Sequence, residues 1–371
     1  MYFLPLLFAI GTLLSVVAAA DEARAIFSGS SRRPFPWTPS KARTHALEIN
    51  DARFGPVNIS YFVINNQAIV DGDVIYGSVE HLLSVFVNPK GILASGLRPL
   101  AKRAHSITRY FSTTKPWPNA KISYKYASAA TEGRLRPTVD EAISRWRRRA
   151  PYLQFLQLSN NESDVAGVVT FWDELCSGCS SHLGFTSQAG GGGMRVNLQS
   201  GCAGTWDACG PDIAVHEIGH LLGTSLSFFS GSSIDSRLSG LHHEHQRADR
   251  NSFVQFNCTA LDPRCPDGSS LASGQTCCDV TAPKLAPHIP PGCCAMIHNF
   301  DIHRGIAFDA SGAYDVNSVM HYEPGAFALP GHTTLVPSAV SRTALRPHLP
   351  SDPSDGDVER ICQLYPGPCA H

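Results

Sequence analysis

Residues 216–250 read HEIGHLLGTSLSFFSGSSIDSRLSGLHHEHQRADR, a stretch that opens with an HExxH motif and closes with a cluster of histidines. His216 and His220 are four residues apart, so on an α-helix both imidazoles point the same way. Their nitrogens can therefore both lie about 2.1 Å from the same Zn²⁺. Glu217 lies one step around the helix, off the metal and within reach of a water molecule. The motif predicts a zinc-binding helix over residues 213–223 that ends at Gly223 in the left-handed region; the alternative is a helix with two surface histidines.

A catalytic zinc ion needs a third protein ligand, and the sequence offers one after an interruption. Deleting seventeen residues, either Gly223 to Ser239 or Thr224 to Gly240, joins the two halves into HEIGHLLGLHHEHQRADR. The joined text matches one long motif, H-E-x-x-H-x-x-G-x-x-H-E-x-x-R-x-D-R, in which His243 is the third ligand.

This motif resembles the zinc signature of the astacin family of metzincin zinc endopeptidases. YDVNSVMHYEPGAF, residues 314–327, resembles the Met-turn of the same family. The resemblance implies that Met320 lies beneath the zinc ion and that Tyr322 ligates zinc or stabilises the transition state. It also implies that Glu244 pairs with the new N-terminus that forms when a propeptide is removed.

Weaker matches extend the resemblance over residues 104–371. KPWPNAKISYKY resembles the first strand of the mature domain, and GDVERICQLYPGPC resembles its C-terminal helix. GGMRVNLQSGC falls where the family has an edge strand, so a protein or peptide substrate is expected to bind extended along Met194–Gln199. VDGDVIYG resembles the propeptide element in which Asp73 occupies the zinc; a simple Gly-Asp turn is the alternative.

The order of the expected elements indicates the fold class. Apolar runs predict strands before the HExxH motif, and TVDEAISRWRRRAP predicts a helix over residues 138–151 that Thr138 caps. Irregular, Cys-rich sequence follows the motif, and the order indicates an α+β domain whose first half holds a sheet. The resemblance implies a metzincin catalytic domain with an N-terminal mixed-sheet subdomain, an active-site helix and an irregular C-terminal subdomain that carries the Met-turn.

The N-terminal region predicts export and processing. Residues 1–20 end in an A-x-A site at Ala18 and Ala20, which favours a removed signal peptide over a membrane anchor. Residues 21–103 end at the dibasic pair Lys102-Arg103 and are expected to form a propeptide; the alternative for the pair is a solvated charge cluster. The catalytic domain would then be residues 104–371.

Twelve cysteines and three N-x-S/T sequons fit the same extracellular location. Six of the cysteines lie in residues 258–294, which predicts a disulfide-stapled insertion. Spacing leaves the connectivity open. The resemblance implies a bridge from a cysteine after the first helix to the C-terminus, but this chain has no cysteine at that point. Cys362 with Cys369, and Cys202 or Cys209 with Cys176 or Cys179, are the pairings to consider.

The charge balance limits the partners. Thirty Lys and Arg residues against thirty-one Asp and Glu residues leave a net charge of −1. No long basic block is present, which argues against nucleic-acid binding, and no membrane contact is expected once the signal is removed.

These features predict a secreted metalloendopeptidase made as a zymogen, with one Zn²⁺ per chain held by His216, His220 and His243. Glu217 would act as general base, and Tyr322 would donate to the developing oxyanion. Two alternatives stay open: another zincin whose third ligand is a downstream glutamate, and a catalytically inactive, secreted, Cys-rich binding protein on the same scaffold. Substrate preference, the propeptide cleavage point and the oligomeric state are not specified by the sequence.

The anomalous insertion, residues 224–240, separates ligands that the family brings together with one tight turn. Lengthening a flexible loop to about twenty residues costs only about 1 to 2 kcal/mol of closure entropy. The ends of the insertion can be encoded as the borders of a short unspliced intron, so we expect it to be an artefact of the gene model.

Overall fold

The computed structural model describes the parts of the chain that form the sheet, the main helices and the histidine cluster. The signal peptide, the dibasic pair and most of the insertion 224–240 lie outside the described residues. The described residues are 44–51, 55–86, 115–163, 167–185, 193–201, 208–223, 228–230, 233–235, 241–263, 269, 271–281, 293–302, 312–340 and 344–365.

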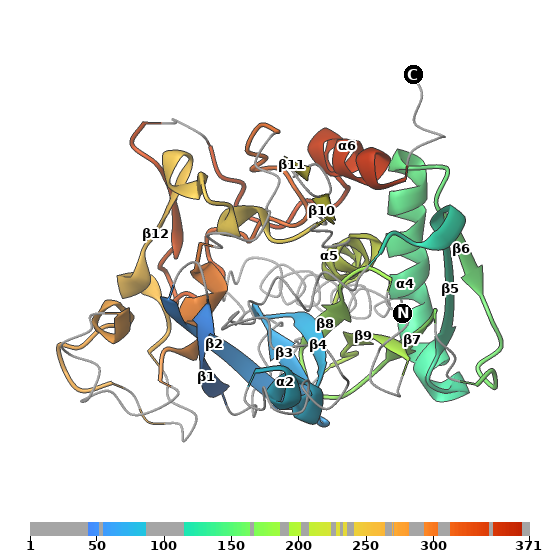
Figure 1. Ribbon diagram of the computed structural model, residues 1–371, viewed down its shortest axis with the longest axis horizontal. Helices are drawn as coiled ribbons and strands as arrows, with labels where there is room; N and C mark the ends of the chain where they lie inside the picture. Colours follow the sequence, from blue (N-terminus) through green and yellow to red (C-terminus); the bar gives the residue numbers. More distant parts are fainter. Residues whose placement is uncertain are drawn as a thin grey trace, which may run out of the picture. The chain divides into compact units, whose positions relative to one another are not determined.

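The described strands of two separate parts of the chain form one nine-stranded sheet (Figure 1). The first four strands are antiparallel and come from the expected propeptide, whereas the last five come from the expected catalytic domain. In spatial order the strands are β1 (Thr44–Asp51), β2 (Gly55–Ile64), β3 (Gln67–Val70), β4 (Val74–Ser78), β8 (Cys179–His182), β9 (Met194–Leu198), β7 (Val168–Trp172), β5 (Lys121–Tyr126) and β6 (Gln154–Gln157).

The two parts join where β4 pairs with β8 in a parallel ladder. Val74 lies opposite Ser181, and the Ser181 amide donates to the Asp73 carbonyl at 2.8 Å. β9 has a neighbour on each side, so the expectation of an edge strand at Met194–Gln199 is wrong. Among the five strands of the catalytic part, β8 lies at the edge that pairs with β4, and β6 lies at the opposite edge. Sheet order depends on pairing across the chain and cannot be read from one strand.

Two helices cover the catalytic part of the sheet. α4 (Ala129–Arg149) begins at Ser128, whose hydroxyl accepts from the Thr131 amide at 3.1 Å. The expected start at Thr138 is wrong, because Pro137 lies inside the helix and does not end it. The predicted basic last turn, Arg147 to Arg149, is confirmed.

The second helix, α5 (Pro211–Leu222), carries the HExxH motif and packs against α4. The indole nitrogen of Trp146 on α4 donates to the Val215 carbonyl at 2.9 Å. The indole of Trp117 donates to the Leu221 carbonyl at 2.7 Å. Both indoles are at most 2% exposed, so α5 is fixed by hydrogen bonds inside an apolar core as well as by burial.

The C-terminal half contains short elements and one further α-helix. Two strands pair antiparallel there, and the Met-turn string lies just before the second of them. A mixed sheet with segregated helices confirms the α+β prediction. The elements are η3 (Glu244–Gln246), η4 (Arg250–Ser252), β12 (Val254–Phe256), η5 (Cys258–Ala260), η6 (Cys277–Thr281), η8 (Ala295–Phe300), β13 (Leu335–Pro337) and α6 (Asp355–Leu364); in the N-terminal part, α2 (Val79–Phe86) follows β4 and η2 (Pro118–Ala120) precedes β5.

The insertion contains a small antiparallel hairpin of its own. Its strands are β10 (Phe228–Ser230) and β11 (Ser233–Asp235), with Phe229 opposite Ile234. The hairpin forms a separate two-stranded sheet, so the described part of the insertion adds no strand to the main sheet.

Disulfides link residues in the sheet region and in the C-terminal region of the catalytic part. Cys179 on β8 pairs with Cys209, one of the pairings considered from the sequence. Within the Cys-rich segment, neighbouring cysteines take different partners, as Cys277 pairs with Cys294 and Cys278 with Cys258. The prediction that disulfides hold this segment together is therefore confirmed. Cys176, Cys293 and Cys362 are also disulfide-bonded, with partners outside the described residues.

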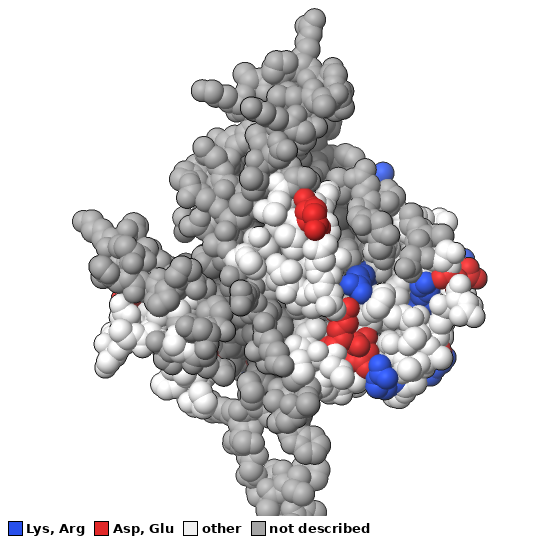
Figure 2. Space-filling view, turned by 90° about the horizontal axis from the view of Figure 1, so that it is seen from below, with Lys and Arg blue, Asp and Glu red and all other residues white. Residues whose placement is uncertain are grey.

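Charged side chains of both signs are mixed on the described surface. On the face drawn in Figure 2, acidic and basic side chains lie beside one another, in keeping with the near balance of charge in the sequence. Within the described ranges, none of the helices combines the length and the apolar character needed to cross a bilayer.

Candidate metal centre

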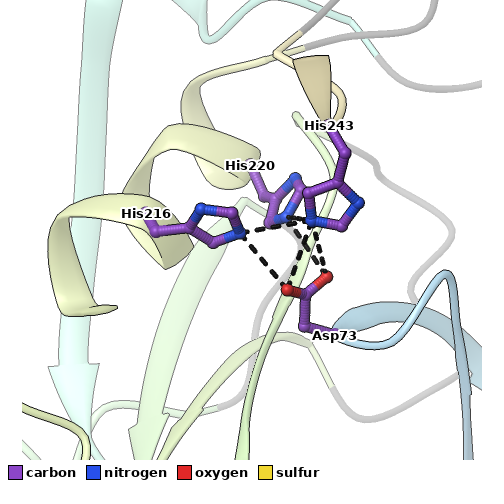
Figure 3. A group of neighbouring side chains, drawn as sticks. All are labelled: Asp73, His216, His220 and His243. Atoms are coloured by element: carbon purple, nitrogen blue, oxygen red, sulfur yellow. Dashed lines mark hydrogen bonds and ion pairs between the residues drawn. The ribbon is translucent and has the colours of Figure 1, made fainter. Parts of the chain in front are cut away.

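The three histidines of the long motif meet at one point in the buried interior (Figure 3). His216 and His220 project from α5, and His243 arrives from the segment after the insertion. The Nε2 atom of His243 lies 3.2 Å from that of His220 and 3.3 Å from that of His216. The insertion therefore does not keep the third histidine away from the other two.

Asp73 supplies a fourth group from the turn before β4 (Figure 3). Its carboxylate oxygens lie 3.2 Å from His216 Nε2, 3.4 Å from His220 Nε2 and 3.1 Å from His243 Nε2. Four ligand atoms at about 2.1 Å from one tetrahedral zinc ion would lie about 3.4 Å from one another. The three nitrogens and one carboxylate group are therefore spaced as a tetrahedral zinc site requires.

Each imidazole is oriented through its other nitrogen. His216 Nδ1 donates to the Val319 carbonyl at 2.6 Å, and His220 Nδ1 donates to the Leu241 carbonyl at 3.1 Å. His243 Nδ1 donates to Gln246 Oε1, also at 3.1 Å. These bonds leave the lone pair of every Nε2 directed at the shared centre, as in protein sites that bind zinc through histidine.

α5 continues through both histidines to Leu222. Gly223 ends it with φ −70° and ψ 176°, so the expected left-handed ending is wrong. The Gly223 amide still donates to the Gly219 and His220 carbonyls, which closes the last turn without a positive φ.

The Met-turn lies directly beneath α5. Met320 is fully buried, and a Cβ added to Gly219 would come within 2.5 Å of its sulfur, so the thioether packs against the bare backbone of the helix. Asp357 on α6 holds the turn, accepting from the Ser318 hydroxyl at 2.6 Å and the Val319 amide at 2.9 Å.

Burial and mutual charge set the pKa values in the cluster. Burial alone raises the pKa of Asp73, but its histidine neighbours, His243 foremost, outweigh burial and hold that pKa well below its usual range. Burial lowers the pKa of His216, and it lowers the pKa of His220 to about 4. Neutral imidazoles at neutral pH are the form that binds a metal ion.

Glu217 lies next to the histidines on α5, and its carboxylate makes no hydrogen bond within the described part of the chain. It is fully buried, and neither carboxylate oxygen has a hydrogen-bond partner among the described residues. Burial, with the charge of Asp73, raises its pKa well above the usual range. A buried carboxylate without a hydrogen-bond partner is costly, so Glu217 is a candidate for contact with a water molecule or substrate.

The ring of Tyr322 stacks on that of His245 and is tilted against that of His243, with its hydroxyl beside Asp73. Its ring centroid lies 4.7 Å from that of His243 and 4.1 Å from that of His245. The hydroxyl donates to Asp73 Oδ2 at 3.3 Å. Burial raises the Tyr322 pKa well above its usual range, so the phenol keeps its proton and can act as a donor.

All five sequence-predicted site residues thus lie at one place, and the structure adds three that the sequence reading did not assign. Gln246 orients His243, Asn299 lies against Gly72 in the turn that carries Asp73, and Asp357 holds the Met-turn. Only Asp357 has a local signal, since Ser354 and Asp357 form a capping box at the start of α6.

Comparisons with known proteins agree with this geometry. The family model described as Astacin, a peptidase family, matches residues 110–227, so the match stops inside the insertion. "Zinc metalloproteinase nas-14" of Caenorhabditis elegans is 26% identical over 225 residues, which cover 60% of this chain and 32% of that protein. "Bone morphogenetic protein 1 homolog" of Strongylocentrotus purpuratus is 24% identical over 256 residues, or 68% of this chain and 31% of that protein.

Among solved structures, high choriolytic enzyme 1, a hatching enzyme zinc-protease from Oryzias latipes, matches with a TM-score of 0.41 and 20% identity. The match covers 68% of this chain and 94% of that one. The chain spans about a third to a half of the length of these curated relatives.

Proposed function

We propose, on the premise that this chain belongs to the astacin family of peptidases, that it is a zinc-dependent endopeptidase made as a zymogen. The observation that carries the proposal is the convergence of His216, His220 and His243. The Nε2 atom of His243 lies 3.2 to 3.3 Å from those of the other two. Beside them, the buried carboxylate of Glu217 has no hydrogen-bond partner among the described residues. One Zn²⁺ per chain, held by these three imidazoles, fits that arrangement.

A bound zinc ion supplies Lewis-acid chemistry, which polarises the peptide carbonyl and activates water. Glu217 takes the proton of the attacking water as general base and passes it to the leaving amine. Tyr322 donates its phenolic proton in a hydrogen bond to the developing oxyanion.

The segment that carries Asp73 accounts for latency. Asp73 places its carboxylate against all three histidines, and β4 pairs with the edge strand β8. Removal of residues 21–103 would free both the zinc ligands and the strand edge. A protein or peptide substrate would then bind extended along β8 through backbone hydrogen bonds, in place of the strand expected from the sequence.

The proposal includes export of the protein. Residues 1–20 act as the signal peptide, residues 21–103 as the propeptide and residues 104–371 as the secreted enzyme. The disulfides Cys179–Cys209, Cys258–Cys278 and Cys277–Cys294 support an oxidising location.

The test uses the full chain after cleavage at the dibasic pair. We expect about one zinc ion per chain by elemental analysis, and hydrolysis of a generic protein substrate that a chelator abolishes. Glu217→Gln should retain zinc and lower kcat by about 10²-fold or more, because the amide cannot take a proton. Glu359→Gln, an exposed position on α6, is the matched control and should leave kcat unchanged. Stoichiometric zinc with cleavage that does not depend on Glu217 would refute the mechanism.

A further inference from the structure

The short helix η8, which directly follows the Cys-rich segment, packs against β2 of the proposed propeptide (Figure 1). Its half-buried Met296 lies between two apolar clusters. One is the core of the catalytic part, and the other consists of four buried propeptide residues, Phe62, Ile64, Ile69 and Ile75. Part of the Met296 side chain is therefore covered by the segment that activation would remove.

Contacts within the catalytic part fix η8 in place. The Cys277–Cys294 disulfide ends one residue before the helix, and the Ile297 amide donates to the Cys294 carbonyl at 2.9 Å. At the other end Phe300 is buried, and its ring stacks on that of Phe256 with the centroids 4.4 Å apart. These contacts do not involve the propeptide, so Met296 should keep its position when the propeptide leaves.

Asn299 connects Met296 to the metal centre. Its Nδ2 donates to Met296 Sδ at 3.4 Å, and its carbonyl accepts from Gln246 Nε2 at 3.2 Å. Gln246 in turn orients His243. The position of Met296 is thereby tied to that of the third candidate zinc ligand.

The propeptide crosses this surface beside the histidines. Gly72 lies against Asn299, and the next residue, Asp73, places its carboxylate on the histidines. Ile75 belongs to the cluster that packs against Met296. Two residues of chain span at most about 7 Å, so apolar side chains of the propeptide begin within that reach of the group at the metal position.

The proposed substrate takes the place of β4 along β8, so its side chains would pass the positions that the propeptide now holds. An apolar side chain uncovered there favours an apolar partner, because their contact removes both surfaces from water. Methionine suits this role, since its flexible, polarisable thioether adapts to apolar groups of different shapes.

We propose that Met296 is a specificity-determining residue, which binds a large apolar side chain of the peptide substrate within three residues of the scissile bond. The Cys-rich segment and η8 thereby supply one side of the substrate site, and the propeptide covers it with its own isoleucines until it is removed. The inference rests on the proposed peptidase function and names the chemistry of one substrate position.

The experiment uses the full chain after cleavage at the dibasic pair. Peptides with one scissile bond carry leucine or asparagine, which are similar in size, at each of the three positions on either side of it. The readout is the ratio of kcat/KM for the leucine peptide to that for the asparagine peptide, which does not depend on the fraction of active enzyme. A second readout is the ratio of the two Kd values for the processed Glu217→Gln variant, which needs no cleavage.

We expect a preference for leucine of about tenfold at one position, as an apolar pocket typically discriminates. Met296→Gln keeps the length of the side chain but makes it polar, and should lower that preference by about fivefold or more. Met296→Leu should keep it within about twofold. Leu271→Ala is the matched control, because Leu271 lies in the same segment and packs against the catalytic core.

Equal cleavage of the leucine and asparagine peptides at every position would overturn the proposal. It would also be overturned if Met296→Gln kept the full preference, or if Leu271→Ala lowered the preference as much, since the effect would then be structural. If Met296→Gln does not fold, Met296→Ala takes its place with the same expected loss. If no form cleaves peptide, the proposed function fails, and the Kd ratios with and without Met296→Gln still decide the role of Met296.

Discussion

Gly72 lies in the turn that brings Asp73 to the histidines, and its conformation leaves no room for a side chain. Its φ is +94°, and an added Cβ would lie 2.7 Å from Tyr322 Oη and 2.8 Å from Asn299 Nδ2. Both the backbone conformation and the close approach therefore require glycine at this position. The proposed latency thus depends on a residue without chemistry of its own.

Gly72→Ala is predicted to weaken latency. Strain at a positive φ costs about 1 to 3 kcal/mol, and the contact with Tyr322 and Asn299 adds to it, so the turn should release the histidines more often. We expect peptidase activity of the uncleaved full chain to rise about tenfold or more, measured before any processing. Gly133→Ala is the control, because a Cβ there meets nothing within 4 Å. Equal activity of the two uncleaved variants would contradict the prediction.

At the scale of elements, the insertion 224–240 is separate from the features that place His243. His220 Nδ1 donates to the Leu241 carbonyl at 3.1 Å, so the residues that flank the insertion are already held together at the cluster. The described hairpin β10–β11 forms its own small sheet.

Deletion of Thr224 to Gly240 should preserve the metal centre. We expect unchanged zinc content, kcat no lower than in the intact chain, and a free energy of unfolding higher by about 1 to 2 kcal/mol, because the loop to be closed is shorter. A variant with a Gly/Ser linker of equal length is the control and should bind zinc equally well. A deletion variant without zinc would show that the segment is needed. The intron hypothesis stays a prediction, which transcripts across the segment would test.

The start of α6 supports the site from the opposite side. Asp357 is fully buried and accepts from the Ser318 hydroxyl and from the amides of Val319 and Ser354. The Val319 carbonyl in turn accepts from His216. A capping residue of the C-terminal helix thereby fixes the orientation of a candidate zinc ligand.

Asp357→Asn is predicted to destabilise the fold by about 2 kcal/mol, because the amide nitrogen would face a donor in place of one carboxylate oxygen. The midpoint of thermal unfolding should fall, and zinc affinity should fall with it. Asp355→Asn is the matched control on the same helix, since the Asp355 side chain is 98% exposed and its surface pair with Arg149 contributes little. Identical melting of the two variants would argue against a role for Asp357.

For the molecule as a whole, the join between the propeptide and catalytic parts contains a buried, uncharged histidine. His182 on β8 lies opposite Ile75 on β4, and its Nδ1 accepts from the Arg195 amide at 2.9 Å. Burial lowers the pKa of His182 to about 4. In the unfolded chain its pKa returns to about 6.5, so between these values only the unfolded chain binds the proton.

Stability should therefore fall as the pH drops through about 6.5 towards 4. His182→Asn keeps an oxygen acceptor for the Arg195 amide but cannot titrate. Between pH 7 and pH 5, we expect the original chain to lose about 2 kcal/mol more of its free energy of unfolding than the variant. Urea unfolding at a series of pH values measures the difference. Parallel pH curves for the two proteins would show that His182 does not contribute.

The sequence by itself determined the features that depend on local geometry. The spacing of His216, Glu217 and His220 has a fixed meaning on a helix of 3.6 residues per turn, so the metal-binding face of α5 could be read directly. The long motif and the Met-turn string extended that reading to His243 and Tyr322. Apolar alternation also indicates strands. The start of α4 is predicted too late, at the possible cap Thr138, whereas the helix begins after Ser128 and runs through Pro137.

Only the tertiary structure decided which distant groups meet. β8, not β9, is the catalytic strand next to β4, because sheet order follows from how the strands pack and not from the pattern within any one of them. The sequence left two readings of Asp73 open, a zinc-blocking carboxylate or a simple Gly-Asp turn, and the structure places its carboxylate on the histidines, beside the pairing of β4 with β8. Arg360 neutralises Glu244 because α6 folds back onto the Met-turn. Contacts of this kind form when segments far apart in the sequence pack together in one buried core. The residues near any one position do not specify which distant segment will pack against them.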